Sequence, residues 1–344
     1  MPSLAWQITT IPIFARQPSE NAMTASDRKT IDRRNFVLAT SGLGLGAWAG
    51  LGAKISFGGP TAAPSRNADR VLRLAHLTDV HVQPELQAGE GFANCLKHVQ
   101  SGEDPPSLIL FGGDNVMNVD SAENTGERAE IQWKLWNSVL KQQCKIPYRI
   151  CVGNHDILGN KNDSGKAWAV EKYGLKHPYY SFDHAGWHMI VLDSTEPLAG
   201  RGYKARLDDA QFAWLEKDLR DTPSTTPVLI LSHIPILTVT SFFDGNNEKT
   251  GDWVIPGPWM HIDARRIKDL FGKHPNVKLC LSGHEHLVDE VSYNQVTYCC
   301  NGAVSGAWWK GNYHECAPGY GIVDLYSDGT FHNQYVVYGW EAKP

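Results

Sequence analysis

The chain has 344 residues, of which 42% are hydrophobic and 20% are charged, and its formal net charge at pH 7 is −5. These values are typical of a soluble globular enzyme with one large or two small domains. The mild acidity argues against an electrostatic grip on nucleic acid, and seven cysteines without a Cys-x-x-Cys spacing indicate neither a zinc knuckle nor a disulfide framework.

Residues 1–66 are predicted to be a targeting segment and linker rather than part of the fold. Arg33-Arg34, followed by the uncharged run 35–53, resembles a bacterial twin-arginine export signal. A plain basic N-terminal flank is the alternative. We expect an exported protein, periplasmic or otherwise extracytoplasmic. The glycine-rich run approaches the length of a membrane span, so retention as a membrane anchor stays open.

From Arg70 onward, strand-like and helix-like segments alternate, which predicts a single layered α/β or α+β domain over 67–344. Apolar runs predict buried strands over 71–77, 108–111, 148–152, 228–231 and 277–281. Cys151 and Cys280 lie inside two of these runs and are expected to be small buried hydrophobes.

Helical spacing predicts helices over 85–100 and 127–142, the second with Ile131, Leu135, Trp136 and Val139 on its apolar face. Residues 179–182 and 187–192 are predicted to form a hairpin. Asp208 with Gln211 predicts a capping box at the start of a helix that runs to about Leu219. After Leu287, antiparallel strands are predicted over 288–293, 296–300, 320–326 and 331–338.

Side chains that ligate metals follow five of the strand-like runs. Asp79 and His81 are two residues apart, so an extended backbone would point both to one side. The same spacing recurs in His284 and His286. The other three segments are Gly113-Asp114, Gly153-Asn154-His155-Asp156 and Ser232-His233. Each segment alone could be a polar turn, but together they predict a metal centre, and carboxylates with imidazoles suit Fe, Mn, Zn or Co.

In this order, the five segments resemble the five sequence blocks of the calcineurin-like metallophosphoesterase superfamily, in particular its class III cyclic nucleotide phosphodiesterase-like branch. The resemblance implies an α+β fold, a four-layer αββα sandwich of two mixed β-sheets with the site at the strand ends. It also implies two divalent or trivalent metal ions. The first would be held by Asp79, His81, Asp114 and His286, and the second by Asp114, Asn154, His233 and His284.

The same resemblance implies a phosphoesterase in which a hydroxide that bridges the metals attacks phosphorus. The expected catalytic residues are the bridging ligand Asp114 and His155, which the family does not assign to a metal. His155 would protonate the leaving oxygen or steady the transition state. Two divalent ions, two carboxylates and one hydroxide leave a charge of about +1, which attracts a phosphate.

Met117 departs from several branches of the family. Purple acid phosphatases carry a tyrosine at this position, protein serine/threonine phosphatases begin an Asp-Arg-Gly there, and many cyclic-nucleotide-cleaving relatives have an aspartate. The residue that orients His155 therefore stays open. Asp193, at the end of a strand-like run, is one candidate, and a plain strand-end aspartate is the other interpretation.

We expect a phosphodiesterase for small or nucleotide-like substrates. A phosphomonoesterase of broad specificity is the first alternative, and an exported metal- or phosphate-binding protein with little turnover is the second. Asn115 and Trp308 are candidate substrate contacts, although a turn asparagine is an equal interpretation of the first and loop aromatics such as the second more often serve in packing. The segment from Trp253 to Trp259 is a candidate rim loop.

Overall fold

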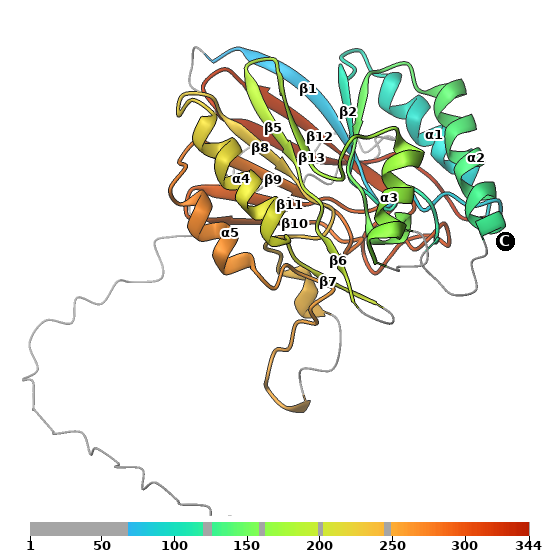
Figure 1. Ribbon diagram of the computed structural model, residues 1–344. Coiled ribbons are helices and arrows are strands. Elements are labelled where there is room, and N and C mark those ends of the chain that lie inside the picture. Colours follow the sequence, from blue (N-terminus) through green and yellow to red (C-terminus); the bar gives the residue numbers. More distant parts are fainter. Residues whose placement is uncertain (1–67, 120–125, 158–161, 199–201, 244–248, 344) are drawn as a thin grey trace, which may run out of the picture. The chain divides into compact units, whose positions relative to one another are not determined.

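The computed structural model describes residues 68–119, 126–157, 162–198, 202–243 and 249–343 (Figure 1). The export segment predicted over 1–66 lies outside them. The described residues belong to one compact unit that spans Ala53–Pro344. Among these residues, no helix combines the length and the apolar character needed to cross a membrane.

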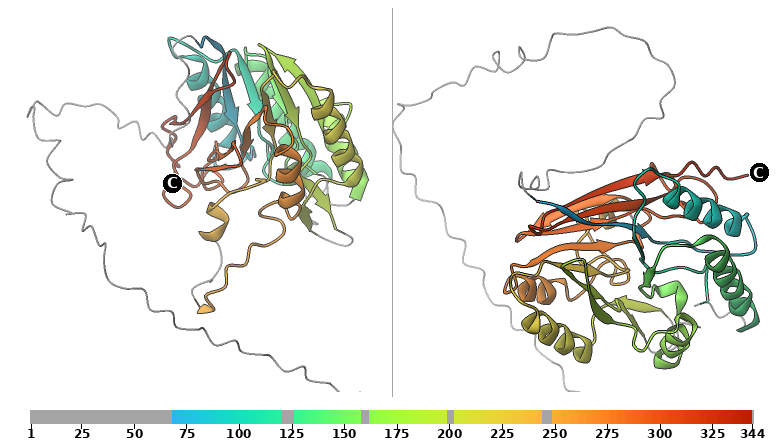
Figure 2. Two further views of the ribbon diagram at one scale, coloured as in Figure 1. Left: turned by 90° about the vertical axis from the view of Figure 1, so that its left-hand side faces the viewer. Right: turned by 90° about the horizontal axis from the view of Figure 1, so that it is seen from above.

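One sheet has five strands in the order β13-β12-β1-β2-β3. Their bounds are Arg70–Leu77 (β1), Leu108–Phe111 (β2), Tyr148–Ile150 (β3), Gly319–Tyr326 (β12) and Phe331–Val337 (β13). β1, β2 and β3 are parallel, whereas β12 is antiparallel to both of its neighbours. The C-terminal strands β12 and β13 thus lie beside the first strand of the unit (Figure 2).

The second sheet has six strands in the order β10-β11-β9-β8-β5-β4. Their bounds are Tyr180–His184 (β4), Trp187–Val191 (β5), Val228–Leu231 (β8), Val277–Ser282 (β9), Asp289–Tyr293 (β10) and Val296–Cys300 (β11). The edge strands β4 and β10 are antiparallel to their neighbours and the four central strands are parallel. A separate ribbon pairs Thr195–Pro197 (β6) with Tyr203–Ala205 (β7).

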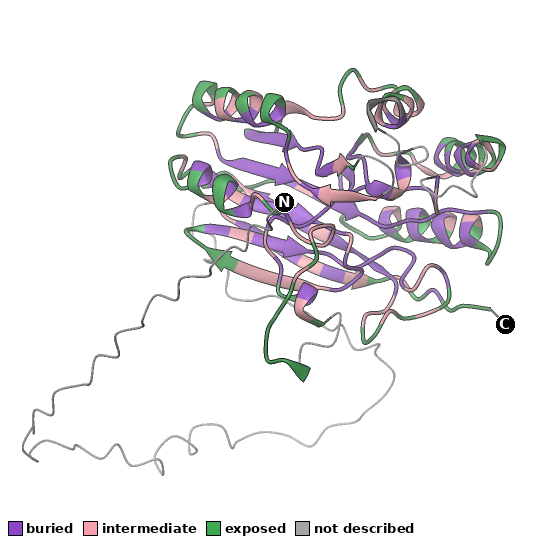
Figure 3. Ribbon diagram, turned by 60° about the horizontal axis from the view of Figure 1, so that its bottom comes forward, coloured by how far each residue is buried: buried purple, intermediate pink, exposed green. Residues whose placement is uncertain are grey.

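Both faces of each sheet are buried, which explains the continuous apolar runs. In β1, Leu72 and Leu74 pack between the sheets, whereas Ala75 and Leu77 face helices α1 (Ala88–Gln100) and α2 (Gly126–Gln143). Helices α4 (Asp209–Asp221) and α5 (Ala264–Phe271) cover the six-stranded sheet. In Figure 3 the sheets are mostly buried, and the helices are buried on their inner faces only. The predicted αββα sandwich of two mixed sheets is confirmed.

Several local predictions need correction. α1 begins at Ala88 instead of residue 85, because Gln87 adopts a left-handed backbone with φ 53°. Ile131 is 43% exposed, and Trp133, which the predicted face omitted, is buried instead. The backbone N–H of Gln211 donates to Asp208 Oδ1 at 2.7 Å as predicted, but the Gln211 side chain bonds the backbone of Asp193, so the capping box is incomplete.

The predicted hairpin is confirmed as β4–β5. Of the predicted antiparallel C-terminal strands, β10–β11 and β12–β13 do form antiparallel pairs. The two pairs belong to different sheets, however, and β11 is parallel to β9. Cys151 and Cys280 are buried as expected. Helix α3 (Asn162–Tyr173) was not predicted.

Candidate metal centre

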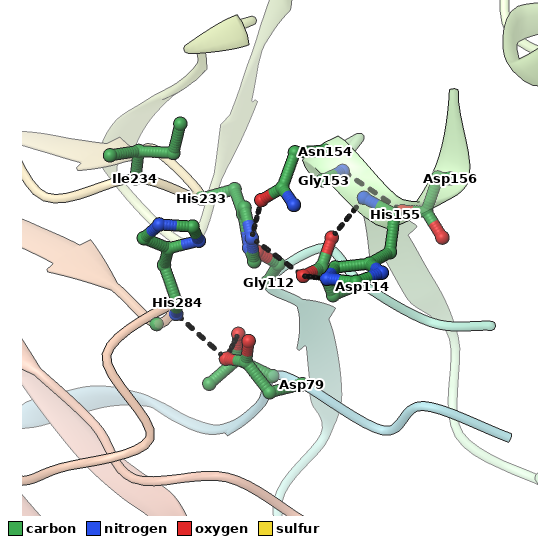
Figure 4. A network of polar contacts seen from close by, with 12 residues as sticks. Asp79, Gly112, Asp114, Gly153, Asn154, His155, Asp156, His233, Ile234 and His284 are labelled. Carbon is green, nitrogen blue, oxygen red and sulfur yellow. Dashed lines mark hydrogen bonds and ion pairs between the residues drawn. The ribbon is translucent and has the colours of Figure 1, made fainter. Parts of the chain in front are cut away.

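The side chains predicted to bind metal meet where strands of the two sheets end. Figure 4 labels Asp79, Asp114, Asn154, His233 and His284 among them. Asp79 and His81 follow β1, Asp114 follows β2, and Asn154 follows β3. From the other sheet, His233 follows β8, and His284 and His286 follow β9. His233 Nε2 lies 3.2 Å from Asp114 Oδ2 and 3.1 Å from Asn154 Oδ1, and His81 Nε2 lies 3.1 Å from His286 Nε2. Residues more than 200 positions apart therefore share one centre.

The backbone at the centre differs from the extended geometry expected from the spacing. Asp79, His81, Asp114, His284 and His286 have φ angles of 54°, 46°, 51°, 72° and 56°. Such left-handed conformations cost on the order of 1–3 kcal/mol each in residues other than glycine, and they persist where the surrounding structure enforces them. The backbone therefore turns after the strand instead of staying extended. Both side chains of the Asp79/His81 pair and of the His284/His286 pair reach the centre from loops.

Two glycines allow the loops to approach closely. A Cβ atom on Gly153 would lie 2.1 Å from Asp114 Oδ1, and one on Gly283 would lie 2.0 Å from Thr78 Oγ1 and 2.2 Å from Asp79 Oδ2. Both glycines directly precede predicted ligands. Any larger residue would displace a carboxylate, which explains the glycine before Asn154 and before His284.

Backbone carbonyl groups set the tautomers of three histidines. The Nδ1–H groups donate to the carbonyl oxygens of Gly112 (from His233, 2.9 Å), Gly306 (from His286, 2.6 Å) and Met117 (from His81, 3.3 Å). Since a carbonyl can only accept, Nδ1 carries the proton in each neutral ring, and Nε2 then offers its lone pair to the centre. Met117 thus contributes its carbonyl oxygen and not its side chain.

The resulting donor set fits bound cations. The Nε2 lone pairs of His81 and His286 face each other at 3.1 Å. The buried Asp79 Oδ1 has no hydrogen-bond partner among the described residues, although it lies 3.4 Å from His286 Nε2. Nitrogen and carboxylate donors that face one another without protons are the ligands of transition metals.

The electrostatics agree with this interpretation. Burial alone would raise the pKa values of Asp79 and Asp114, but the surrounding imidazoles outweigh burial and hold both pKa values below the usual range. Burial lowers the pKa of His81 to about 4 and that of His284 to about 3, which keeps these rings neutral and able to ligate. For His233, the nearby Asp114 outweighs burial and raises the pKa to about 9, so a metal ion would replace a proton there.

Two groups of converging ligand atoms each contain three residues of one predicted ligand set. Asp79, His81 and His286 form one, and Asp114, His233 and His284 form the other; within each group the ligand atoms lie within 4.8 Å of one another. A third group joins Asp114 to His81 and His155. The structure thus places Asp114 between the groups, and its assignment as a bridging ligand stays a prediction.

The role of Asp156 was missed in the sequence, although it belongs to the Gly-Asn-His-Asp turn. Its Oδ1 accepts from the backbone N–H groups of Asn115 (2.9 Å) and Val116 (3.3 Å), and its Oδ2 accepts from that of Gly153 (2.9 Å). Asp156 therefore connects the loop after β2 to the loop after β3 by hydrogen bonds. The signal that could have revealed it is an acid three residues after the glycine, where it can accept that N–H.

Two further predictions need correction: the substrate contact of Asn115 and the role of Asp193 in orienting His155. Asn115 is fully buried and does not line the pocket; its Nδ2 donates to Tyr173 Oη at 2.7 Å, so its contact is internal. Asp193 pairs with Lys166 and does not orient His155. The backbone N–H of His155 donates to Asp114 Oδ1 at 2.8 Å, and its Nε2 lies 4.0 Å from Asp114 Oδ2.

A cavity of about 170 Å³ opens onto the centre. Four predicted metal ligands and His155 line it, together with Glu285 and four aromatic residues: Tyr203, Trp259, Trp308 and Tyr313. The Trp308 ring centre lies 4.5 Å from that of His286, which places this predicted substrate residue at the wall. Of the predicted rim loop, Trp259 lines the cavity, whereas Trp253 is 59% exposed and does not.

Comparison with known proteins agrees with this geometry. A probable glycerophosphodiester phosphodiesterase of Arcobacter nitrofigilis is 26% identical over 232 residues, 65% of this chain and 75% of that protein. The 3′,5′-cyclic adenosine monophosphate phosphodiesterase of Escherichia coli K12 is 25% identical over 270 residues, 75% of this chain and 87% of that protein.

Among solved structures, a dimetal phosphatase from Danio rerio has the same fold. The match has a TM-score of 0.53 at 12% identity and covers 79% of this chain and 100% of that one. The family model of the calcineurin-like phosphoesterases matches residues 72–288, which include every predicted metal ligand. The chain therefore belongs to the calcineurin-like phosphoesterase family and is a metal-dependent phosphoesterase.

Proposed function

We propose that this phosphoesterase hydrolyses small phosphodiesters. The observation that carries the proposal is the lining of the cavity, in which aromatic rings surround the metal centre. Among the described residues that line it, there is no lysine or arginine. A monoester dianion would gain no further cation there, whereas the second alcohol of a diester has aromatic surface to pack on.

The predicted ligand residues would hold two metal ions. Asp79, His81, Asp114 and His286 would bind one ion, and Asp114, Asn154, His233 and His284 the other. When bound, the two ions supply an activated water and positive charge for the phosphoryl oxygens. The carbonyl groups that fix the His81, His233 and His286 rings, and Asp156 between the two loops, keep these donors in place before substrate arrives.

His155 would move the proton in this reaction. It lines the cavity beside Asp114, and its side chain is 25% exposed, so its ring can reach a substrate as well as solvent. A leaving alkoxide needs a proton, and a positioned imidazole can supply it. Trp308, whose ring centre lies 4.5 Å from that of His286 in the cavity wall, would hold the alcohol group.

The substrate class can be tested with matched chromogenic esters. Purified protein loaded with Mn, Fe or Zn is assayed with bis(4-nitrophenyl) phosphate and with 4-nitrophenyl phosphate. We expect kcat/KM for the diester to be about tenfold higher or more, which corresponds to about 1.4 kcal/mol of transition-state binding. Equal or higher kcat/KM for the monoester would favour the phosphomonoesterase. Two bound metals without turnover of either ester would favour a binding protein.

We also propose export through the segment 1–66. Its support is the Arg33-Arg34 pair before the uncharged run 35–53. Changing both arginines to lysine should leave the protein in the cytoplasmic fraction of a bacterial host that has the twin-arginine pathway, while the unchanged chain reaches the periplasm or its membrane. Equal distribution of the two proteins would contradict export by this route.

A further inference from the structure

A second cavity, of about 420 Å³, lies between the edge strands β3 and β4 and the loop that follows α3. It shares no lining residue with the cavity at the metal centre. β3 is an edge of the five-stranded sheet and β4 an edge of the six-stranded sheet, so the cavity opens where the two sheets meet at one side. Nothing in the proposed reaction uses it.

The lining combines flat rings with positive charge. Tyr148, Tyr173 and Tyr180 contribute rings, and Arg149, Lys176 and His177 contribute basic groups. No aspartate or glutamate is among the described residues that line this cavity, although the whole chain has a net charge of −5. Such an apolar, aromatic wall with a few convergent groups of one sign is typical of a small-molecule site.

The basic side chains are available to a ligand. Lys176 is exposed and forms no ion pair within the described part of the chain. The Arg149 guanidinium lies 4.9 Å from the centre of the Phe182 ring, and one of its N–H groups donates to the Tyr148 carbonyl oxygen at 3.0 Å. No acid is paired with it among the described residues. Tyr148 is 40% exposed and offers a ring face beside these cations.

We propose that this cavity binds a small organic anion that carries a flat aromatic ring system. The ring would pack against the tyrosines, and the anionic group would be held by Arg149 and Lys176. Arginine suits this role because its planar N–H groups match the oxygens of phosphate, sulfonate or carboxylate groups.

The cavity wall is connected by hydrogen bonds to the loops of the metal centre. Tyr173 Oη accepts from Asn115 Nδ2 at 2.7 Å, and the Asn115 backbone N–H donates to Asp156, which also holds Gly153. Tyr180 Oη donates to the Ile150 carbonyl oxygen at 2.9 Å and accepts from the Ile150 N–H at 3.1 Å. Asp114 and Asn154 are adjacent to these bonded residues. A ligand that shifts Tyr173 would therefore move the loops that carry Asp114 and Asn154 and change kcat.

The probe for the test is 8-anilinonaphthalene-1-sulfonate, an aromatic sulfonate that a phosphoesterase cannot hydrolyse. It is titrated into the full metal-loaded protein and followed by fluorescence and calorimetry. We expect one saturable site. The double variant Arg149→Ala/Lys176→Ala should bind the probe at least tenfold more weakly, whereas the matched pair Lys217→Ala/Arg220→Ala, on the exposed face of α4, should bind it unchanged.

Three results would overturn the site: unchanged affinity in the Arg149/Lys176 variant, equal weakening in the α4 variant, or loss of probe binding when the metal ions are removed, which would place the probe at the metal centre. If the double variant does not fold, Lys176→Gln alone serves, since its side chain is exposed and should still lower the affinity severalfold. With the site saturated, kcat for the diester should change in the unchanged protein and not in Arg149→Ala/Lys176→Ala. A constant kcat would refute the connection to the metal centre.

Discussion

His155 lines the cavity at the metal centre without belonging to either ligand set that the family resemblance implies. Its backbone is fixed by Asp114, and its ring packs edge-on against His81 with ring centres 4.9 Å apart. We therefore expect His155 to act in proton transfer and not as a metal ligand. This separation of roles makes His155 the most informative residue to change.

We predict that His155→Gln lowers kcat for an ester with a poor leaving group by about 10²–10⁴-fold, since a general acid contributes about this much. The metal content should stay at two ions per chain, measured by elemental analysis. For a 4-nitrophenyl leaving group, which needs little protonation, the loss should be smaller. His184→Gln, at an exposed position, is the control. An equal loss for both leaving groups would show that His155 acts on the transition state by another route.

The residue identities at the centre could be predicted from the sequence, because acids, amides and imidazoles after apolar strands are rare in this arrangement. Their backbone geometry could not. The Asp-x-His and His-x-His spacings suggested extended segments, whereas these residues have φ angles of 46–72°. The left-handed turns arise from contacts across two sheets, such as the His284 N–H donating to Asp79 Oδ2 at 2.9 Å. No local pattern contains that information.

At the scale of elements, the turn after β3 depends on a close approach that only glycine permits. Gly153→Ala would place a methyl group 2.1 Å from Asp114 Oδ1. We therefore predict that this variant loses paired metal binding and falls below about 1% of the original kcat/KM, measured with the diester and by metal analysis. Gly126→Ala, at the first position of α2 with nothing within 4 Å of the new atom, is the matched control. Two retained metals in Gly153→Ala would show that the loops can separate at little cost.

The sequence patterns predicted some helices and strands better than others. The buried strands were found because both faces of each run are apolar. Helix α3 was missed because its residues show almost no separation of apolar and polar faces. Trp133 was left out of the α2 face because Ile131 fitted the same spacing, yet Trp133 packs edge-on against Tyr173 of α3, with ring centres 4.6 Å apart. The presence of a third helix decided which face of α2 is buried.

His188 connects the β4–β5 hairpin to α4 by hydrogen bonds, and we predict from its pKa that the stability of the fold depends on pH. It lies between Asp218 Oδ2 (2.8 Å) and Asp183 Oδ1 (2.7 Å), and the hydrogen bond with Asp218, followed by that with Asp183, outweighs burial and raises its pKa. Because the pKa is higher in the folded state, the stabilisation is complete below about pH 6.5 and is lost as pH rises through the folded pKa. His188→Gln should therefore lower Tm more at about pH 5.5 than at about pH 9. Thermal melting at both pH values, with His184→Gln as control, checks this. An equal loss at both pH values would mean that His188 stabilises by packing alone.

At the scale of the whole compact unit, the metal centre joins the two sheets. The predicted ligands Asp79, His81, Asp114 and Asn154 extend from the five-stranded sheet, and His233, His284 and His286 from the six-stranded sheet. The order of the sequence blocks predicted the two mixed sheets through the family resemblance. The order of the blocks could not show that the two C-terminal hairpins belong to different sheets. The pairing of β12 with β1 joins residues far apart in the sequence, and no local pattern indicates it.

Metal removal should therefore weaken the whole fold and not only the activity. An ion that binds the folded chain alone stabilises it by RT ln(1 + [L]/Kd), about 4 kcal/mol at a thousandfold excess over Kd, and chelation removes this contribution. Chelation also leaves the like-charged carboxylates and facing imidazole lone pairs of the centre without a cation between them. We predict that a chelator such as EDTA lowers Tm by on the order of 10 °C, and that adding back Mn or Zn restores it. Asp114→Asn, which lacks the carboxylate charge, should melt at a temperature that the chelator hardly changes. If Tm of the unchanged protein were the same with two ions bound and with none, the metal centre would contribute to catalysis but not to the stability of the fold.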